Sequence, residues 1–348
     1  MAHDDTAFRL LAELTGLSGV SGQEEPLRTA LRDHLASRVD RVRTDALGNL
    51  LGIKHGQPAG PRLLLAAHMD EIGLVVTQIE GGFLRFARVG GADLRVLPAQ
   101  EVTVHTAQGD LPGVVASRPP HVLGPEERRR PFRQAQLFID LGLEEAQVRE
   151  RVQVGDFVSL RQETVRLGQA FATGKAVDNR ASLVVLLRTL DHLQTMAHAW
   201  EVVALATVQE EITLGGAYTG TYSVRPHVGI ALDVTFARQP GVADEEGVAW
   251  DRGPAIALGP NIHPRVRERL VETAQRHEIP YVEEVLPGHS GTDAWAIQVT
   301  RSGVPTGLLS LPIRNMHTPG ETVCLRDMER TARLLAHFIA ELEPDWTP

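Results

Sequence analysis

The sequence predicts an α/β protein with a mostly parallel sheet flanked by helices, and a small antiparallel β-barrel inserted into it. Three observations predict this class. Short, continuous apolar runs of the kind that are buried on both faces of a sheet occur at 62–67, 201–208, 228–232 and 304–311. Segments of helical periodicity alternate with these runs, as expected for a sheet covered by helices. Between about 72 and 165 the pattern changes to short β-rich segments separated by Gly or Pro turns.

The segment before the first buried strand predicts two helices and a hairpin. Residues 6–37 show helical spacing in two pieces, and a loop of small residues at 16–22 separates them. Residues 41–53 read as extended structure with a turn at 47–49. The apolar run at 62–67 then gives the first buried strand.

The β-rich segment is best explained as a small antiparallel barrel. Its clearest strands are expected at 83–89, 101–105 and 156–161. Within it, residues 118–133 are rich in proline and charge and contain a run of arginines, which we interpret as a solvated loop.

The α/β pattern returns after residue 170 and continues to the C-terminus. We therefore divide the chain into an α/β domain formed by 1–71 and 166–348, and an inserted domain at 72–165. Helices are expected in the second part of the α/β domain at 178–193, 265–277 and 325–342.

Composition excludes several classes of protein. A net charge of −9 argues against a nucleic-acid partner, because phosphate binding needs clustered Lys and Arg. The single cysteine, Cys324, rules out an internal disulfide and a cysteine-rich zinc site. No apolar stretch approaches the ~20 residues that span a bilayer, and the N-terminus lacks the apolar core of a signal peptide. We expect a cytoplasmic protein with no membrane partner.

Acidic and histidine residues follow the predicted strands, or open a helix, at positions where they could meet. In open α/β sheets, ligands bind beyond the carboxyl ends of the strands. Asp178 alone could be a helix cap and Asp233 alone a turn residue. Together, so many carboxylates would repel one another unless a cation joined them, which favours a metal site. The candidates are His68, Asp178, Glu210, Glu211, Asp233 and His317.

Two imidazoles and three carboxylates without a thiolate suit catalytic zinc, cobalt or manganese. Five ligands are too many for one catalytic ion that keeps an open position, and they suit two ions that share a carboxylate. Glu210 and Glu211 are adjacent, so on extended backbone one can bind metal while the other acts as general base. Asp70, two residues after His68, can hydrogen-bond to its ring and orient it.

Six short motifs, in this order, resemble the tetrahedral (TET) aminopeptidases, a family of cytosolic dinuclear metallopeptidases also labelled glutamyl aminopeptidase or endoglucanase-like. Each motif alone is weak, but the ordered set covers most of the chain. The motifs are HMDEIG at 68–73, GKAVDNRAS at 174–182, VQEE at 208–211, ALDVT at 231–235, GTDA at 291–294 and MHTPGE at 316–321.

The resemblance implies a role for each matching residue. His68 and Asp233 would be terminal ligands, Asp178 would bridge two divalent ions, and Glu211 and His317 would complete the set. Glu210 would be the general base and Asp70 the residue that orients His68. A cis peptide bond is expected between Asp178 and Asn179.

The resemblance also implies an assembly. The insertion at 72–165 resembles the family's dimerisation domain, and members commonly form hollow dodecamers that admit peptides, so we expect a homo-oligomer. In such an assembly the segment at 118–133 would line the chamber or neighbour an active site, which is the alternative to its interpretation as a solvated loop. The chain departs from the family at 212–216, where Ile-Thr-Leu-Gly-Gly replaces a Gly-Leu-Arg-Gly-type run and an arginine is missing. In GTDA, Thr292 or Asp293 could cap a helix or line a substrate pocket, and His289 could contact the reaction intermediate or be a plain loop residue.

Removal of the N-terminal residue from short peptides is the function this sequence favours. A glycoside hydrolase is the first alternative, but such enzymes generally need no dinuclear metal and usually line their clefts with aromatic residues, which are only 5% of this chain. A non-catalytic paralogue that acts through assembly is the second, and it would have lost a ligand or the base. The sequence leaves the preferred N-terminal residue, the physiological metal and the number of subunits open.

Overall fold

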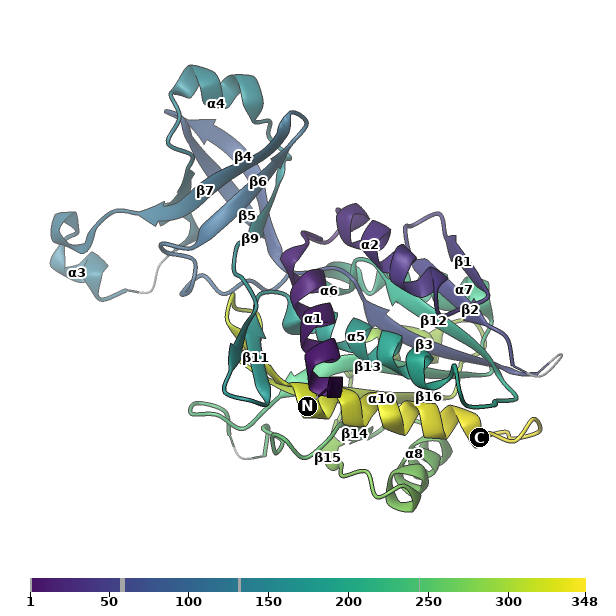
Figure 1. Cartoon of the computed structure of the whole chain (residues 1–348). Coiled ribbons are helices and arrows are strands. Elements are labelled where there is room, and N and C mark those ends of the chain that lie inside the picture. The colour runs from purple at the N-terminus through teal and green to yellow at the C-terminus, as the bar shows by residue number, and fades with distance from the viewer. Residues whose placement is uncertain (1, 57–59, 131–132, 244) are drawn as a thin grey trace.

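The large sheet is built around four parallel strands whose sequences are almost wholly apolar (Figure 1). In spatial order they are β12 (Glu201–Thr207), β3 (Arg62–His68), β13 (Val228–Phe236) and β16 (Thr306–Arg314). On β3, Leu63 enters the core on one face of the sheet and Leu64 the core on the other. Burial on both faces explains why these runs are continuous rather than alternating. The structure is a computed model of the chain and describes residues 2–56, 60–130, 133–243 and 245–348.

Antiparallel strands extend both edges of this parallel centre. On one side β12 pairs with β2, which pairs with β1; on the other, β16 pairs with β17, followed by β11 and β10. Off the main path, β14 pairs with β16, and β15 pairs with β14. The bounds are β1 (Arg41–Thr44), β2 (Leu50–Lys54), β10 (Val165–Leu167), β11 (Phe171–Gly174), β14 (Ala255–Leu258), β15 (Val282–Val285) and β17 (Glu321–Cys324).

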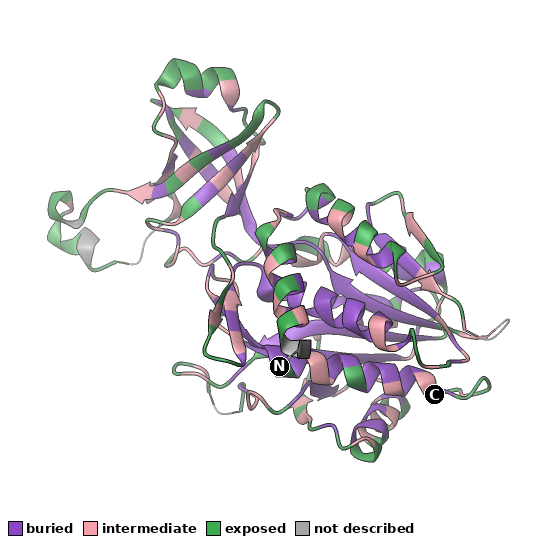
Figure 2. Cartoon of the chain, viewed as in Figure 1, coloured by how far each residue is buried: buried purple, intermediate pink, exposed green. Residues whose placement is uncertain are grey.

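Helices cover both faces of the sheet. One face carries α5 and α10, which pack on each other and on α1, with α8 beside α10 and α2 against β1 and β2. The opposite face carries α7 and α9. Figure 2 shows the central strands buried beneath the helices; α1 and α2 have exposed outward sides, whereas α5 is buried over nearly its whole length. The bounds are α1 (Ala2–Gly16), α2 (Glu25–Ala36), α5 (Val177–His192), α6 (Glu210–Thr213), α7 (Gly215–Val224), α8 (Pro264–Arg276), α9 (Asp293–Val299) and α10 (Leu325–Ala340).

A closed six-stranded antiparallel barrel projects from this α/β body (Figure 1). Its strands run in the order β4-β5-β8-β7-β6-β9 around a hydrophobic core of its own. The predicted fold class, an α/β sheet with an inserted β-barrel, is therefore confirmed. The bounds are β4 (Gly73–Glu80), β5 (Phe83–Val89), β6 (Glu101–Thr106), β7 (Gly109–Ser117), β8 (Leu137–Asp140) and β9 (Phe157–Leu160), with α4 (Glu145–Arg151) beside them.

The proline-rich and charged segment at 118–133 lies between β7 and β8, and Figure 1 shows it extending away from the barrel. Its described part forms short helical turns, η1 (Pro120–Val122) and α3 (Pro125–Arg128), with η2 (Gln134–Gln136) just beyond it. Residues 131–132, which we assigned to the same loop, lie outside the described residues. Its interpretation as a solvated loop stays a prediction.

Two local expectations were wrong. Residues 210–211 are not extended, because the short helix α6 begins at Glu210. The last central strand is longer than its apolar run and continues to Arg314, so the loop that carries His317 is correspondingly shorter. Among the described helices, none is long and apolar enough to cross a membrane.

Candidate metal centre

The predicted ligands lie together at the carboxyl ends of the parallel strands. His68 is the last residue of β3 and pairs in register with Thr207, the last residue of β12. The chain after β12 turns into α6, which begins with Glu210 and Glu211. Asp233 lies on β13, which flanks β3 on its other side. Since parallel strands share one carboxyl edge, their terminal side chains meet there.

Two ligands come from irregular backbone. Asp178 lies in the first turn of α5, where its dihedral angles (φ −75°, ψ 104°) are not helical and its peptide bond to Asn179 is cis, as expected. His317 lies in the loop after β16 with a positive φ of 62°. Ala176 and Gln209 also have positive φ, at 53° and 58°. Such values are uncommon outside glycine, so tertiary structure holds the backbone around the ligands in unusual conformations.

The ligand atoms form two groups that share Asp178. In one, His68 Nε2 lies 3.1 Å from Asp178 Oδ1 and 3.9 Å from Asp233 Oδ1. In the other, His317 Nε2 lies 3.4 Å from Asp178 Oδ2 and 3.6 Å from Glu211 Oε2. Each oxygen of Asp178 thus faces a different group. Within each group one ligand atom per residue lies within 4.8 Å of the others.

These separations fit divalent metal ions. Metal–ligand bonds of about 2.1 Å in a tetrahedral arrangement place neighbouring donor atoms about 3.4 Å apart, and the donor separations here are 3.1–3.9 Å. The donors are imidazole nitrogens and carboxylate oxygens, the set preferred by zinc and similar catalytic metals. These residues could therefore hold two ions, one on each side of the Asp178 carboxylate.

The site is crowded with carboxylates. Burial and the neighbouring carboxylates of Asp233 and Asp293 together raise the pKa of Glu210 to about 10, against an opposite effect of His68. Burial also raises the pKa of Glu211 to about 7. For His68, burial lowers the pKa, but Glu210 and Asp178 outweigh it and hold the pKa well above its usual value. In the absence of a cation, protons would occupy this site, and divalent ions can replace them.

Asp70 holds the glutamate segment more directly than it holds His68. Its carboxylate accepts hydrogen bonds from the backbone N–H of Glu210 at 2.9 Å and of Glu211 at 3.1 Å, and from the hydroxyl of Ser21 at 2.5 Å. His68 Nδ1 lies 3.5 Å from Asp70 Oδ1 but 3.1 Å from the backbone oxygen of Asp70. Orientation of the ring by the carboxylate therefore stays a prediction.

Sequence reasoning assigned no role to two residues that position the ligands. Glu321 is buried and accepts the backbone N–H of both Asp178 (2.9 Å) and His317 (2.8 Å), so one carboxylate ties two ligand segments together. Gly91 lies against the His317 ring, since a Cβ built on it would lie 2.5 Å from His317 Nδ1. Glu321 belongs to the MHTPGE motif, and the Gly90-Gly91 pair is a sequence signal that could have indicated a close approach of the backbone to another group.

A cavity of about 1300 Å³ opens beside the ligands. His68, Asp178, Glu210, Asp233 and His317 all contribute to its lining. The GTDA segment borders the same space: Thr292 lines it and also caps α9, accepting the backbone N–H of Ala294 at 3.2 Å. His289 lines the cavity as well and packs against Trp295 in a tilted arrangement, with ring centroids 4.3 Å apart. The cavity is large enough for the end of a peptide.

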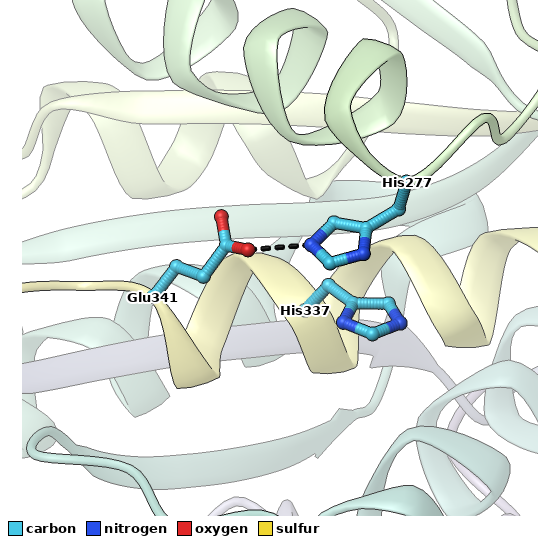
Figure 3. Close-up of side chains that lie close together, drawn as sticks. All are labelled: His277, His337 and Glu341. Atoms are coloured by element: carbon cyan, nitrogen blue, oxygen red, sulfur yellow. Dashed lines mark hydrogen bonds and ion pairs between the residues drawn. The ribbon is translucent and has the colours of Figure 1, made fainter.

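A separate histidine cluster joins α8 to α10 (Figure 3). The rings of His277 and His337 are stacked with centroids 3.7 Å apart, and Glu341 accepts a hydrogen bond from His277 at 2.5 Å. The other oxygen of Glu341 pairs with Arg276 at 2.5 Å. None of these four is among the described residues that line the cavity. Because Glu341 already binds two basic groups and the rings stack rather than converge, we interpret the cluster as a contact between helices.

Comparisons with known proteins agree over nearly the whole chain. A family model for the M42 glutamyl aminopeptidases matches residues 48–334. A lysyl aminopeptidase from Pyrococcus furiosus is 34% identical, over 98% of this chain and 99% of the relative. The structure of aminopeptidase APDkam598 from Desulfurococcus kamchatkensis superposes with a TM-score of 0.92 at 37% identity, over 99% of this chain and 97% of the other. The structure of the TET1 peptidase of Pyrococcus horikoshii, which can assemble into a tetrahedron or a large octahedral shell, superposes with a TM-score of 0.84 at 30% identity. The match covers 97% of this chain and 100% of the other.

Proposed function

The chain belongs to the family of M42 glutamyl aminopeptidases, and from this we propose that it removes the N-terminal residue of short peptides with a dinuclear metal centre and a glutamate base. The ligands in this proposal are His68, Asp178, Glu211, Asp233 and His317. Glu210 is the general base, and zinc, cobalt or manganese is the metal.

The shared carboxylate of Asp178 is the observation that carries the proposal. Its two oxygens face two separate donor groups, each completed by one histidine and one further carboxylate. A structural zinc site would be closed by four ligands around one ion. Here two incomplete groups share one bridging residue, which leaves room for substrate on both ions, as hydrolytic two-metal sites require.

The position of Glu210 supports the proposal that it transfers the proton. Its carboxylate lies 3.9 Å from His68 Nε2, lines the cavity and is in neither donor group. When bound, the ions supply Lewis acidity to the scissile carbonyl and lower the pKa of the attacking water. Glu210 accepts the proton of that water and delivers it to the leaving amine. Asp70 supports this step because it fixes the backbone N–H groups of Glu210 and Glu211.

The alternative functions have less support. Glycoside hydrolysis needs two carboxylates facing each other across a sugar bond, whereas the carboxylates here converge with histidines on common centres. A non-catalytic paralogue is disfavoured because both donor groups and Glu210 are present. Family membership does not decide the preferred side chain, since the names of relatives include both glutamyl and lysyl aminopeptidases.

We also propose that the chain forms a homo-oligomer, with dimers made through the barrel at 72–165 and assembled into a dodecamer. The TET1 peptidase supports this, since it covers 97% of this chain and forms closed shells. Light scattering on the purified protein would test the assembly. A monomer at micromolar concentration would contradict it.

Activity and metal content together test the proposed centre. The purified protein is stripped with a chelator, refilled with Zn²⁺, Co²⁺ or Mn²⁺, and assayed on a panel of aminoacyl-p-nitroanilides, while bound metal is counted by mass spectrometry. We expect two ions per chain and activity that returns only with metal. Glu210→Gln should keep both ions and lose about a hundredfold to ten-thousandfold in kcat, the usual contribution of a general base.

Glu268→Gln is the matched control, because Glu268 is exposed on α8 and does not line the cavity. It should leave both metal content and kcat unchanged. If Glu210→Gln loses an ion, Glu210 is a ligand and the assigned base is wrong. A refilled protein that holds two ions but cleaves neither the panel nor longer peptides would refute the peptidase proposal.

A further inference from the structure

Glu284 projects into the cavity beside the proposed metal centre. It lies on β15 and is half-buried among the residues that line the cavity. Its carboxylate accepts hydrogen bonds from two buried hydroxyl groups, one from Ser310 at 2.8 Å and a short one from Thr235. Both hydroxyls belong to central strands of the sheet, so the carboxylate is fixed in place at the wall of the cavity.

The strand register places this carboxylate close to the ligand Asp233. Ser310 on β16 is the direct partner of Asp233 in the parallel ladder. Thr235 follows Asp233 by two residues on β13 and so points to the same face, about 7 Å further along the strand. A substrate residue whose backbone lies at the ligands would therefore extend its side chain toward Glu284.

Glu284 has no counter-charge of its own. Within the residues that the structure describes, no ion pair joins it to a basic side chain, and burial raises the pKa of its carboxyl above the usual value. The hydroxyls of Thr235 and Ser310 act in the opposite direction, since both stabilise the ionised form. A partly buried carboxylate held by two hydroxyl donors but lacking a cation is a site that a cationic ligand would complete.

The other charged groups around the cavity are already engaged or more exposed. Arg238, which would favour an acidic side chain, is exposed, and its Nε donates a hydrogen bond to the backbone oxygen of Gly247 at 3.2 Å. Glu283, the neighbour of Glu284 on β15, is exposed and forms an ion pair with Arg267. The fixed negative charge of Glu284 therefore lies deeper and is less compensated than either.

We propose that Glu284 determines the specificity of this aminopeptidase, and that the cavity accepts a lysine or arginine as the N-terminal residue, with its cationic head bound to Glu284. This inference rests on the proposed function. The long aliphatic stem of either side chain can span the roughly 7 Å along β13 between Asp233 and Thr235, the residue that binds Glu284. The stem can also pack on the apolar wall of Val282 and Leu286. The carboxylate then gains the charge-assisted hydrogen bond that it lacks.

Substrates that differ mainly in charge test the proposal. The protein, refilled with metal, is assayed for kcat/KM on p-nitroanilides of lysine, arginine, norleucine, leucine and glutamate. Every substrate carries the same α-amine, so its contribution cancels in the ratios. Norleucine nearly matches the length of lysine without its charge. We expect kcat/KM for the lysine and arginine substrates to exceed that for the norleucine substrate by about tenfold or more, which is the effect of one charged hydrogen bond. The glutamate substrate should have the lowest kcat/KM.

Glu284→Gln keeps the length and the hydrogen-bonding capacity of the side chain and removes only its charge. It should lower kcat/KM for the lysine substrate about 10- to 100-fold. The kcat/KM values for the norleucine and leucine substrates should change less than about twofold, which is the size of effect expected from a substitution that touches no important contact. Glu268→Gln makes the same change at an exposed residue of α8 that does not line the cavity, and it should alter no ratio. Calorimetry with lysinamide and norleucinamide gives a second readout, in which only lysinamide should lose affinity for Glu284→Gln.

The possible failures are distinguishable. If no aminoacyl substrate is cleaved, the proposed function fails first. If the leucine or glutamate substrate is cleaved better than the lysine substrate, the proposed peptidase activity stands and this inference is overturned. The same holds if Glu284→Gln lowers kcat/KM equally for all substrates. If Glu284→Gln does not fold, the kcat/KM values of the unmodified protein for the lysine and norleucine substrates decide alone. Equal values for the two substrates refute the proposal.

Discussion

Gly91 is the residue at which the barrel reaches the proposed centre. It follows β5, and a methyl group added to it would lie 2.5 Å from Nδ1 and 2.9 Å from Cε1 of His317. We expect Gly91→Ala to displace the His317 ring and lower kcat on the order of a hundredfold, since displacements near 1 Å cost about that much. Metal titration of the stripped protein should show one of two ions bound more weakly.

Gly16→Ala is the control for this substitution. Gly16 ends α1, has open space around it and lacks the positive φ that would strain an alanine. It should keep full activity and both ions. An active Gly91→Ala with two tightly bound ions would show that the ring moves aside without cost and that Gly91 does not position His317.

At the scale of residues, the sequence could predict those site residues that lie at or near the end of a recognisable strand. His68 and Asp233 belong to such strands, and a row of polar groups after apolar runs is visible in one dimension. Glu321 and Glu284 could not be assigned roles in this way. Their hydrogen bonds join segments that are distant in sequence, as when Glu321 accepts the N–H of Asp178 143 residues away. Only the tertiary structure brings those partners together.

At the scale of elements, we expect the contact between α8 and α10 to depend on the protonation of His337. Burial lowers the pKa of His337, and its electrostatic interactions with His277 and Arg333 lower it further, against an opposite effect of Glu341. His192 on α5 also lowers it, and Arg276 pairs with Glu341 nearby. Because the folded pKa lies below the ordinary value of about 6.5, the folded state binds fewer protons than the unfolded state as pH falls.

The stability that neutral His337 contributes is therefore fully present above about pH 6.5 and is lost as pH falls below it. We expect His337→Phe, which keeps a flat ring for stacking but cannot be protonated, to lose less stability than the unmodified protein between about pH 7.5 and about pH 5.5. Thermal melting at both pH values measures this. Parallel changes in Tm for the two proteins would show that His337 does not titrate in this window.

Elements were predictable where their pattern was long. The apolar runs of β3, β12 and β13 and the amphipathic helix α10 were found within a few residues. The four-residue strands β14, β15 and β17 were missed, because so few residues carry no clear period. The helical turn α6 was predicted as extended, since a left-handed residue, Gln209, turns the chain immediately after β12. Such a turn at a non-glycine residue has no reliable sequence signature.

At the scale of the whole molecule, the proposed centre joins distant parts of the chain. Its ligands run from His68 to His317 and come from three central strands or the loops after them, from α5 and from α6. From the residues alone, their convergence could be predicted only through the inferred parallel sheet, because no two of the five ligands are close in sequence. The unfolded chain cannot form such a site, so any ion bound there stabilises the folded state alone.

Metal removal should therefore lower thermal stability as well as activity. One ion at a thousandfold excess over its Kd stabilises the folded state by about 4 kcal/mol, so chelation should lower Tm on the order of 5–10 °C. Asp178→Asn weakens the carboxylate shared by both donor groups, and its Tm should respond much less to chelator or to added metal. Asp33→Asn, on the exposed side of α2, should respond as the unmodified protein does. If chelation removes activity but leaves Tm unchanged in all three proteins, the ions do not join these segments, and the shared centre at Asp178 must be abandoned.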